Sequence, residues 1–584
     1  MAVKRKQPRL IASRPCLAAA LAAILLMGSA CASGTSPSPT PAVQTPDVPR
    51  PPLTPRWVYE PWVWEDEQHT AAAVLNLVDD YRTHGVPVGA VIVDSPWETN
   101  YNTFDFGPNY PDPAGLIGDL HTRGVKVLLW ATPFVNVASV DGPQRGKAAL
   151  YDQASAAGYL VDGGSSYAWE KGTGSVVDFF NPDAVAWWYR QLDRAADLGV
   201  DGWKVDSPER SLPEALQTAA GPTTRREYGD AYYRAFYRYV AERDPEQTIT
   251  ARPIAAGTVY APLDANPAGW VGDQEPNWQG LRSALNSILE SAEQGYAVLG
   301  SDIGGYRPGP RASNLFLRWM ELGALSPLME NGGRGEHRPW KLGRSVLHAY
   351  RYYAKLHHQL VPYLYSAGVE ANASGLPIIR DVDRQARQYT LGPDLLVAPM
   401  VTPDEARDVK LPAGARWYDY WDDDQVIEGP AALSYQLPLE RIPLFIRGGA
   451  IIPMQVDDGE TGHGGRGSAG HLTLLVYPDG SSTRTYHPDA RRSVEFGASR
   501  DGGNVTIQVG PQTERYSLRI KEPGNPTNPV LTRGDVATAL PSFASWPDFD
   551  LAVEGWYYDA ARHLLWVRFA TQDTAARLTY ATLP

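Results

Sequence analysis

Apolar runs of strand length alternate with longer amphipathic stretches between residues 56 and 365. Uninterrupted apolar runs are typical of strands buried on both faces of a parallel sheet, and the stretches between them have helical spacing. Eight such runs follow one another, at residues 57–63, 89–94, 126–132, 200–206, 248–252, 269–273, 296–302 and 325–330. Eight strands that alternate with helices predict a (β/α)8 barrel. Helices are expected at residues 67–84, 114–123 and 182–198, and residues 133–159 are expected to form a helical or irregular excursion.

The pattern changes after residue 365. Short alternating segments follow, separated by Gly, Pro, Asp and Asn at strand-plus-turn spacing. This pattern of short alternating segments and turn residues is typical of β-sandwiches. A Gly-rich stretch at residues 459–470 marks a long loop or a boundary. We therefore predict a catalytic barrel over residues 56–365, a proximal β-sandwich over 366–456 and a distal β-rich domain over 457–584.

Charged or polar residues stand at the ends of six predicted strands. They are Asp94, Asp206, Arg252, Asp273 and Asp302, with Glu330 and Asn331 together at the eighth strand. In a barrel of this kind the catalytic groups lie at the C-terminal strand ends, so these side chains are expected to converge on one mouth. Randomly placed surface charge would not fall at strand ends so regularly, which favours a functional site over loop capping.

Residues 198–209 (LGVDGWKVDSPE) predict a short buried strand that ends in a carboxylate. Strand alternation places Lys204 and Asp206 on the same face. Burying both charges costs free energy unless they meet each other or a polar ligand. In isolation this motif indicates a structural ion pair. Together with the other strand ends it indicates a polar site.

The first 31 residues have the pattern of an export signal. Basic residues precede an almost wholly apolar run, residues 16–27, which is too short to span a membrane. Residues 28–31 (GSAC) resemble a lipobox, so we expect lipidation of Cys31 and a membrane tether. Cleavage by an ordinary signal peptidase at residues 30–32 is the alternative, and either route exports the protein. Residues 32–55, rich in Ser, Thr and Pro, are expected to be a semi-extended linker.

Composition narrows the possible partners. A chain of 584 residues is expected to fold as two to four domains, and its net charge of −13 argues against a nucleic-acid partner. The 2 cysteines, Cys16 and Cys31, both lie in the export segment, so the exported body has neither a disulfide nor a thiol metal site. No metal-ligand cluster, phosphate loop or dinucleotide fingerprint stands out, so we expect no cofactor. The sequence does not indicate an oligomeric state.

Several blocks of the chain, taken in order, resemble glycoside hydrolase family 31, the α-glucosidase and α-xylosidase family. They are residues 201–206 (DGWKVD), 270–273 (WVGD), 300–306 (GSDIGGY), 394–399 (DLLVAP) and 442–449 (IPLFIRGG). One block alone would be weak support, but their shared order makes the resemblance strong. It implies a barrel followed by β-domains and an oligosaccharide or glycoside as substrate.

The resemblance also implies roles for single residues. It makes Asp206 the catalytic nucleophile and Asp273 the general acid/base. Substrate contacts are expected from Asp94, Lys204, Arg252, Trp270, Asp302, Tyr306, Glu330, Asn331, Trp62 and Trp169. The tryptophans Trp62, Trp64 and Trp169 suit stacking on sugar rings, and a position in the core is equally compatible with each of them.

The chemistry of glycoside cleavage fits these residues. Cleavage with retention of configuration needs an ionised carboxylate and a protonated carboxyl group about 5–5.5 Å apart. Lys204 beside Asp206 is expected to favour the ionised form, and Trp270 is expected to help keep Asp273 protonated.

The chain also departs from the family pattern. The linker leads directly into the barrel, so the usual N-terminal β-sandwich is expected to be absent. Many family members have Trp at the position of Lys204. A Lys at this position resembles the α-xylosidase-like and some α-galactosidase-like members. The family's Arg-x-His at the eighth strand is replaced by residues 329–331 (MEN), with His337 further on. These changes leave the sugar specificity open.

The sequence therefore predicts a retaining exo-α-glycosidase, with α-glucosidase as the default activity. The alternatives are α-xylosidase or α-galactosidase specificity and an α-transglycosylase that uses the same residues. A non-catalytic carbohydrate-binding surface protein is the alternative of a different class. The presence of both carboxylates and of Arg252 favours the enzyme.

Overall fold

The computed structural model describes residues 49–206 and 208–583. The expected export signal, the lipidation site at Cys31 and most of the expected linker lie outside the described residues. The end of that linker is already part of the folded body, because Thr54 donates a hydrogen bond to the carbonyl of Pro267 at 2.7 Å and is buried. Within the described ranges, the helices are all too short or too polar to cross a membrane.

The predicted barrel is present. Each of its eight expected strands forms, and each is shorter than its expected range. In spatial order the 8-stranded parallel sheet runs β14 (Leu299–Gly300), β13 (Ala268–Trp270), β10 (Thr248–Ala251), β7 (Gly202–Val205), β3 (Lys126–Ala131), β2 (Ala90–Val93), β1 (Trp62–Val63) and β15 (Glu330–Asn331). A parallel bridge between Asp302 and Glu330 joins the two outer strands, and Ile303 N donates to Glu330 O at 3.0 Å. The sheet is therefore closed on itself.

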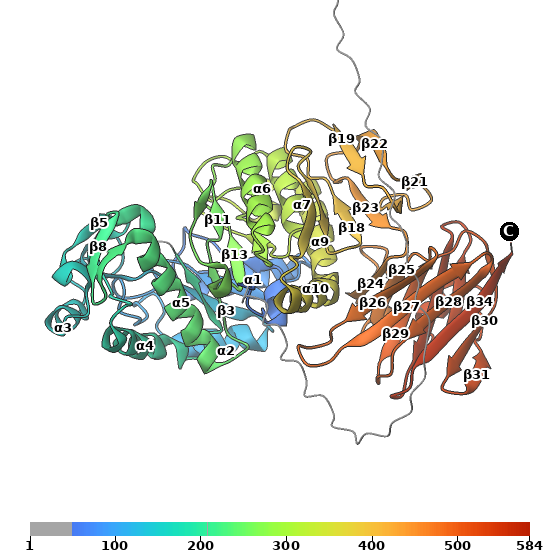
Figure 1. The fold of residues 1–584 in the computed structure, drawn as a ribbon, viewed down its shortest axis with the longest axis horizontal. Helices are drawn as coiled ribbons and strands as arrows, with labels where there is room; N and C mark the ends of the chain where they lie inside the picture. The colour runs from blue at the N-terminus through green and yellow to red at the C-terminus, as the bar shows by residue number, and fades with distance from the viewer. Residues whose placement is uncertain (1–48, 207, 584) are drawn as a thin grey trace, which may run out of the picture. The chain divides into compact units, whose positions relative to one another are not determined.

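Helices pack against the outside of this sheet (Figure 1). They include α1 (Ala71–Thr83), α2 (Pro113–Thr122), α4 (Pro182–Ala196), α5 (Arg225–Arg243), α6 (Trp278–Glu293), α7 (Ser313–Ala324), α9 (Arg344–Gln359) and α10 (Val361–Ser374). Local sequence defines their starts: Asn181 caps α4 ahead of Pro182, and Thr224 with Glu227 forms a capping box on α5. The expected end of the barrel at residue 365 falls inside α10.

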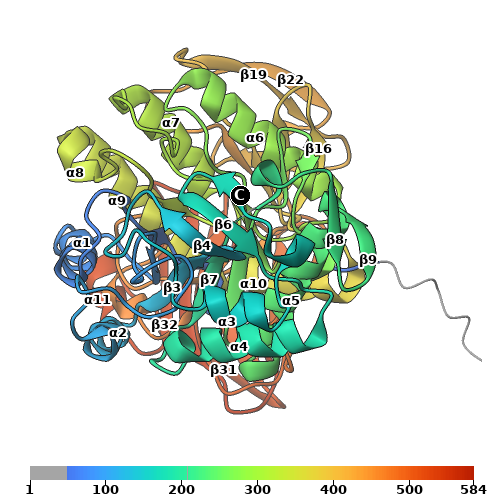
Figure 2. The same cartoon turned by 90° about the vertical axis from the view of Figure 1, so that its left-hand side faces the viewer.

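The segment after β3 differs from the expectation of a helical or irregular excursion. It forms a three-stranded antiparallel sheet in the order β4 (Phe134–Ser139), β6 (Gly172–Val176) and β5 (Tyr167–Trp169), with a short helix α3 (Tyr151–Ala156). Figure 2 faces the side of the molecule that carries β4 and β6 and the hairpin of β8 (Ala215–Thr218) and β9 (Gly221–Thr224). Strand β6 reads GTGSV, so it has no apolar run by which the sequence could reveal it.

Two β-domains follow the barrel. The proximal one has a 6-stranded sheet of β16 (Ile379–Asp383), β17 (Gln388–Leu391), β18 (Leu395–Val397), β23 (Leu444–Arg447), β20 (Arg416–Asp419) and β21 (Val426–Glu428), plus a pair of β19 (Ala406–Leu411) and β22 (Ala431–Gln436). The distal one has a 5-stranded sheet of β24 (Ile451–Gln455), β25 (Leu472–Val476), β29 (Arg515–Lys521), β33 (Leu564–Ala570) and β32 (Gly555–Asp559). Its 6-stranded sheet comprises β26 (Ser481–Tyr486), β27 (Val494–Asp501), β28 (Asn504–Val509), β34 (Ala576–Leu583), β30 (Asn525–Arg533) and β31 (Val536–Ala539).

The strand pairing bears on one expected boundary. Strand β24 pairs with β25 of the distal sheet, although the expected proximal domain runs to residue 456. The Gly-rich residues 459–470 are consequently a loop inside the distal domain.

Candidate active site

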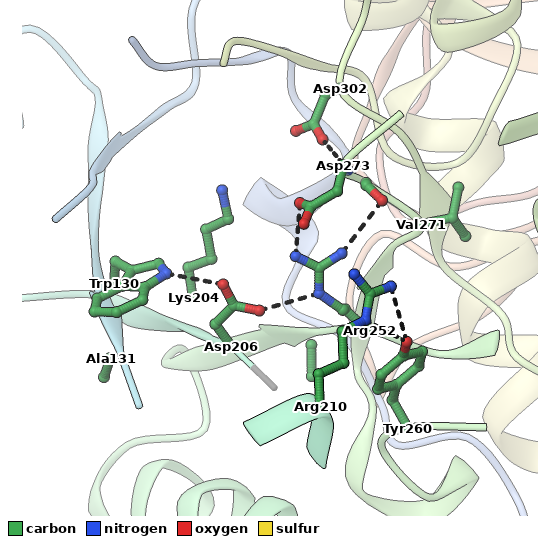
Figure 3. A network of polar contacts seen from close by, with 12 residues as sticks. Trp130, Ala131, Lys204, Asp206, Arg210, Arg252, Tyr260, Val271, Asp273 and Asp302 are labelled. Carbon is green, nitrogen blue, oxygen red and sulfur yellow. Dashed lines mark hydrogen bonds and ion pairs between the residues drawn. The ribbon is translucent and has the colours of Figure 1, made fainter. Parts of the chain in front are cut away.

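Arg252 lies at the centre of the residues that converge on the C-terminal ends of the strands. It follows β10, and its guanidinium Nε donates to Asp206 Oδ1 at 3.0 Å while Nη2 donates to Asp273 Oδ1 at 2.8 Å. Figure 3 shows the guanidinium group placed between the two carboxylates. The third nitrogen, Nη1, donates to the carbonyl of Gly272 at 3.2 Å. One rigid, planar group thus holds both predicted catalytic carboxylates in the same space.

Asp206 is fixed by contacts from neighbouring strands. Its backbone N donates to Ala131 O at 2.9 Å, which continues the pairing of β7 with β3. The indole Nε1 of Trp130 donates to Asp206 Oδ2 at 3.1 Å, so each carboxylate oxygen has a donor (Figure 3). Donors aimed at both oxygens favour one orientation of the carboxylate, as a nucleophile requires.

Asp273 occupies an unusual backbone conformation just after β13. Its φ is +69°, a region that costs a residue other than glycine on the order of 1–3 kcal/mol. The preceding Gly272 leaves room for this turn, because a Cβ there would lie 2.3 Å from Asp302 Oδ2. Asp302 in turn accepts from the backbone N of Asp273 at 3.4 Å, and Arg307 lies 3.5 Å from Asp273 Oδ2. Asp273 is therefore held by arginines, not by the apolar surroundings expected from Trp270.

Lys204 makes a different contact from the one expected. Its ammonium group donates to Asp94 Oδ2 at 3.1 Å and lies 3.5 Å from the centre of the Trp64 ring. Burial opposes the charge of Lys204, but the neighbouring carboxylates, Asp94 first among them, outweigh it and raise the pKa of the amine. The cation that donates to Asp206 is that of Arg252. Lys204 and Asp94, both nearly inaccessible to solvent, form the floor of the site.

A buried pair of acids, Asp302 and Glu330, lies beside this floor on the two strands that close the barrel. Burial, reinforced by Asp302 and opposed by Lys204, raises the pKa of Glu330 to about 8. Burial also raises the pKa of Asp302, against the opposing charge of Lys204. Among the described residues, neither carboxyl oxygen of Glu330 has a hydrogen-bond partner. Glu330 therefore holds a proton near neutral pH and limits the negative charge of the floor.

A pH-dependent stability follows from Glu330. Its pKa in the folded protein lies above the ordinary value of 4.5, so the folded state keeps a proton that the unfolded chain loses as the pH rises. The free energy of unfolding must therefore fall between about pH 4.5 and 8. Glu330→Gln is a neutral isostere. Its Tm should fall less than that of the wild-type protein between pH 6 and 8, and at pH 5 the Tm values of the two proteins should be similar. The exposed Glu242→Gln serves as control, and an equal pH slope in both variants would contradict the assignment.

The other expected substrate residues fall into two groups. Trp270 packs near Lys204 and Arg252, with the Arg252 guanidinium carbon 4.8 Å from its ring centre, and Tyr306 stacks on Trp64 at 5.9 Å. Trp169 is half-buried and packs on Phe134 beside the mouth. Two residues have structural contacts instead. These are Trp62, which is fully buried and stacks on Trp57, and Asn331, whose amide donates to Tyr81 and to the carbonyl of His337.

Four residues of the site were missed by the sequence reasoning. They are Trp130, Asp66, Arg307 and Glu170. Trp130 lies inside a predicted strand, residues 126–132, and not at its end, where the charged side chains of the other strands pointed to the site. Asp66, three positions beyond β1, accepts from Tyr306 OH at 3.1 Å, and burial followed by the charge of Asp94 raises its pKa to about 7. Arg307 directly follows the recognised 300–306 block, which is the signal that could have identified it.

Two further observations delimit the site. In the parts of the chain that the structure describes, no group of three His, Cys, Asp or Glu side chains is arranged to hold a metal ion. A separate cavity of about 740 Å³ lies at the opposite, N-terminal ends of the strands, where Trp57, Gly89 and Lys126 are among its lining residues. Catalytic groups of (β/α)8 barrels lie at the C-terminal ends, so this cavity is not the candidate active site.

Comparison with known proteins identifies the family. The family model described as "Glycosyl hydrolases family 31 TIM-barrel domain" matches residues 51–367, more than half of the chain, and the "Glycosyl hydrolase family 31 C-terminal domain" matches residues 376–452. The chain belongs to glycoside hydrolase family 31. The two family models begin within the expected linker and end inside β24, so nearly all of the distal domain lies beyond them.

Relatives within family 31 carry several activities in their names. An isomaltosyltransferase of Sporosarcina globispora is 24% identical over 90% of this chain and 53% of its own length. Alpha-glucosidase 2 of Bacillus thermoamyloliquefaciens is 25% identical over 75% of this chain and 59% of its own length. The chain thus spans little more than half the length of these curated relatives.

Solved structures of the family share the fold. The cycloalternan-forming enzyme from Listeria monocytogenes, in complex with a pentasaccharide substrate, has a TM-score of 0.80 and 22% identity, over 91% of this chain and 55% of that chain. A Flavobacterium johnsoniae family 31 dextranase complexed with glucose has a TM-score of 0.78 and 21% identity, over 91% and 71% of the two chains.

Proposed function

We propose that this protein is a retaining exo-α-glycosidase with Asp206 as nucleophile and Asp273 as general acid/base. The observation that carries the proposal is the guanidinium of Arg252, which contacts a carboxylate oxygen of each residue. Two carboxyl groups held on a single guanidinium are close enough to act on one glycosidic bond. The family supports the reaction class, and the retaining mechanism is part of our proposal.

The proposed reaction has two steps. Asp206 attacks the anomeric carbon, the bond to the glycosidic oxygen breaks, and Asp273 gives its proton to that oxygen. A glycosyl-enzyme ester remains on Asp206. In the second step a water molecule loses a proton to Asp273 and attacks the anomeric carbon, which releases Asp206 as a carboxylate. Transfer to another sugar differs only in that its hydroxyl group replaces the water.

The buried floor supports exo action on a terminal sugar. Lys204 and Asp94 are nearly inaccessible to solvent and lie beneath the mouth, with Trp64 packed on the ammonium group. We infer that one terminal sugar ring ends at this floor, next to Asp206. Charged donors and acceptors on the floor suit the hydroxyl groups of that terminal ring.

The sugar and the acceptor remain alternatives to be tested. α-Glucosidase is the default, and α-xylosidase or α-galactosidase specificity and transglycosylation are the other candidates. The decisive experiment measures turnover of aryl α-glucoside, α-xyloside, α-galactoside, α-N-acetylgalactosaminide and α-sulfoquinovoside, with product configuration followed by NMR. Retention with one glycoside supports the proposal. Inversion would reject the retaining mechanism, and oligosaccharide binding without turnover of any glycoside would favour a non-catalytic binding protein.

We also propose that the protein is exported and tethered through a lipidated Cys31, on the sequence pattern alone. Cys31→Ser should then move the protein from the membrane fraction to the medium, because it removes the proposed acyl anchor. Cell fractionation and immunoblotting measure the shift, with Ser33→Ala as the matched control. An unchanged distribution would mean cleavage by ordinary signal peptidase or another anchor.

A further inference from the structure

The turn between β5 and β6 lies next to the proposed nucleophile. Trp169, the last residue of β5, pairs with Gly172 of β6, so Glu170 and Lys171 form the turn between them. The ring of Trp169 is parallel to that of Trp130, with an interplanar angle of 3° and 6.3 Å between the ring centres. Trp130 in turn donates to Asp206. One aromatic side chain therefore separates the turn from Asp206.

The backbone of this turn is held on both sides. Trp169 Nε1 donates to Asn136 Oδ1 at 2.8 Å, and Asn136 Nδ2 donates to the carbonyl of Lys171 at 3.1 Å. Lys171 Nζ lies 3.3 Å from Asp141, and Phe134 stacks on Trp169 with 4.4 Å between ring centres. These hydrogen bonds and ring contacts fix the backbone of the turn, so a side chain on it has a defined position, as a ligand-binding residue requires.

Glu170 itself is left without a partner in this otherwise bonded turn. It makes no hydrogen bond or ion pair to another described residue, and it is exposed to solvent. The partial enclosure of its carboxyl group, followed by the charge of Asp206 and, less strongly, of Asp273, raises its pKa, while Lys171 opposes the shift. Through Trp169 and Trp130 the turn that carries Glu170 lies next to Asp206, and Glu170 is open to solvent there.

We propose that Glu170 binds hydroxyl groups of the sugar on the leaving-group side, and that residues 169–171 form the subsite for the leaving group and for a sugar acceptor. The inference rests on the proposed function. A terminal sugar that fills the buried floor must extend its leaving group past Asp273 toward solvent. Glu170 offers an exposed carboxylate on the turn beside Trp169, and a carboxylate can accept hydrogen bonds from two neighbouring hydroxyl groups. The subsite is supplied by the three-stranded sheet inserted after β3.

The test compares two substrates that share the terminal sugar. An oligosaccharide places a sugar in the leaving-group subsite, whereas the glycosyl fluoride of the same sugar leaves that subsite empty. In Glu170→Ala, kcat/KM for the oligosaccharide should fall about 10- to 100-fold, the value of a charged hydrogen bond, and kcat/KM for the fluoride should stay within about twofold. Glu170→Gln, which keeps one acceptor oxygen, should lose less. Asp152→Asn, an exposed carboxylate on α3 of the same inserted segment, is the control.

Each outcome has a defined meaning. A selective loss for the oligosaccharide, with less transfer to added sugar acceptors, supports the subsite. An equal loss for both substrates would show that Glu170 acts on the terminal sugar or on the chemistry, and an unchanged oligosaccharide rate would show that it binds nothing; either overturns the inference. If the wild-type protein does not turn over the fluoride, the proposed function itself fails and the inference with it.

Discussion

Asp206→Ala is expected to lower the turnover of every glycoside by at least about 10⁴-fold. Without this carboxylate the covalent ester cannot form, however good the leaving group is. The structure makes the substitution informative, because Arg252 keeps its hydrogen bond to Asp273 and the mouth retains its other contacts. Initial rates with an oligosaccharide and with the matching glycosyl fluoride measure the loss.

Azide distinguishes a missing nucleophile from a damaged site. A small anion that enters the space vacated by Asp206 should attack the glycosyl fluoride from that side and give the inverted glycosyl azide. Asp183→Ala removes an exposed carboxylate in the first turn of α4 and should leave turnover unchanged. Wild-type rates in Asp206→Ala would refute the catalytic assignment, and thermal unfolding checks that the variant is folded.

Asp273→Ala should have an effect that depends on the leaving group. For an oligosaccharide, which needs a proton to depart, turnover should fall about 10²- to 10⁴-fold. Fluoride departs without protonation, so the first step should survive and the glycosyl-enzyme on Asp206 should accumulate as a burst followed by slow release. Mass spectrometry of the intact protein measures that intermediate directly.

Azide again reports the role of the residue. In Asp273→Ala it should attack the accumulated intermediate without a general base, restore turnover, and give a glycosyl azide with net retention. Asp273→Asn keeps the size of the side chain and should behave in the same way, because it too cannot transfer a proton. An inverted azide product from Asp273→Ala, with a retained one from Asp206→Ala, would mean that the two roles are exchanged.

Much of the barrel could be predicted from the sequence because its strands are buried on both faces. Each therefore needs a largely apolar run, and the run is visible without knowledge of its neighbours, as residues 126–132 and 89–94 illustrate. The same logic located Asp206 and Asp273, since a parallel barrel presents the ends of its strands at one mouth. The three-stranded insertion was missed because β6, with its Gly and Thr residues, has no such run.

Side-chain partners could not be predicted in the same way. Lys204 and Asp206 lie two residues apart, and the sequence suggested that they meet, but Lys204 binds Asp94, which is 110 positions away. Asp206 instead accepts from Arg252, which directly follows the neighbouring strand β10. Side-chain direction and length decide these contacts, and both depend on how adjacent strands are placed.

The sequence by itself determined which segments become strands and which residues end them, because apolar burial and strand alternation act along the chain. Only the tertiary structure decided that one arginine holds both carboxylates, that Trp62 belongs to the core, and that β24 joins the distal sheet. It also brought the turn at Glu170 to the mouth of the barrel. Side-chain hydrogen bonds and solvent exposure depend on how segments far apart in the chain pack together, so no local sequence pattern encodes them.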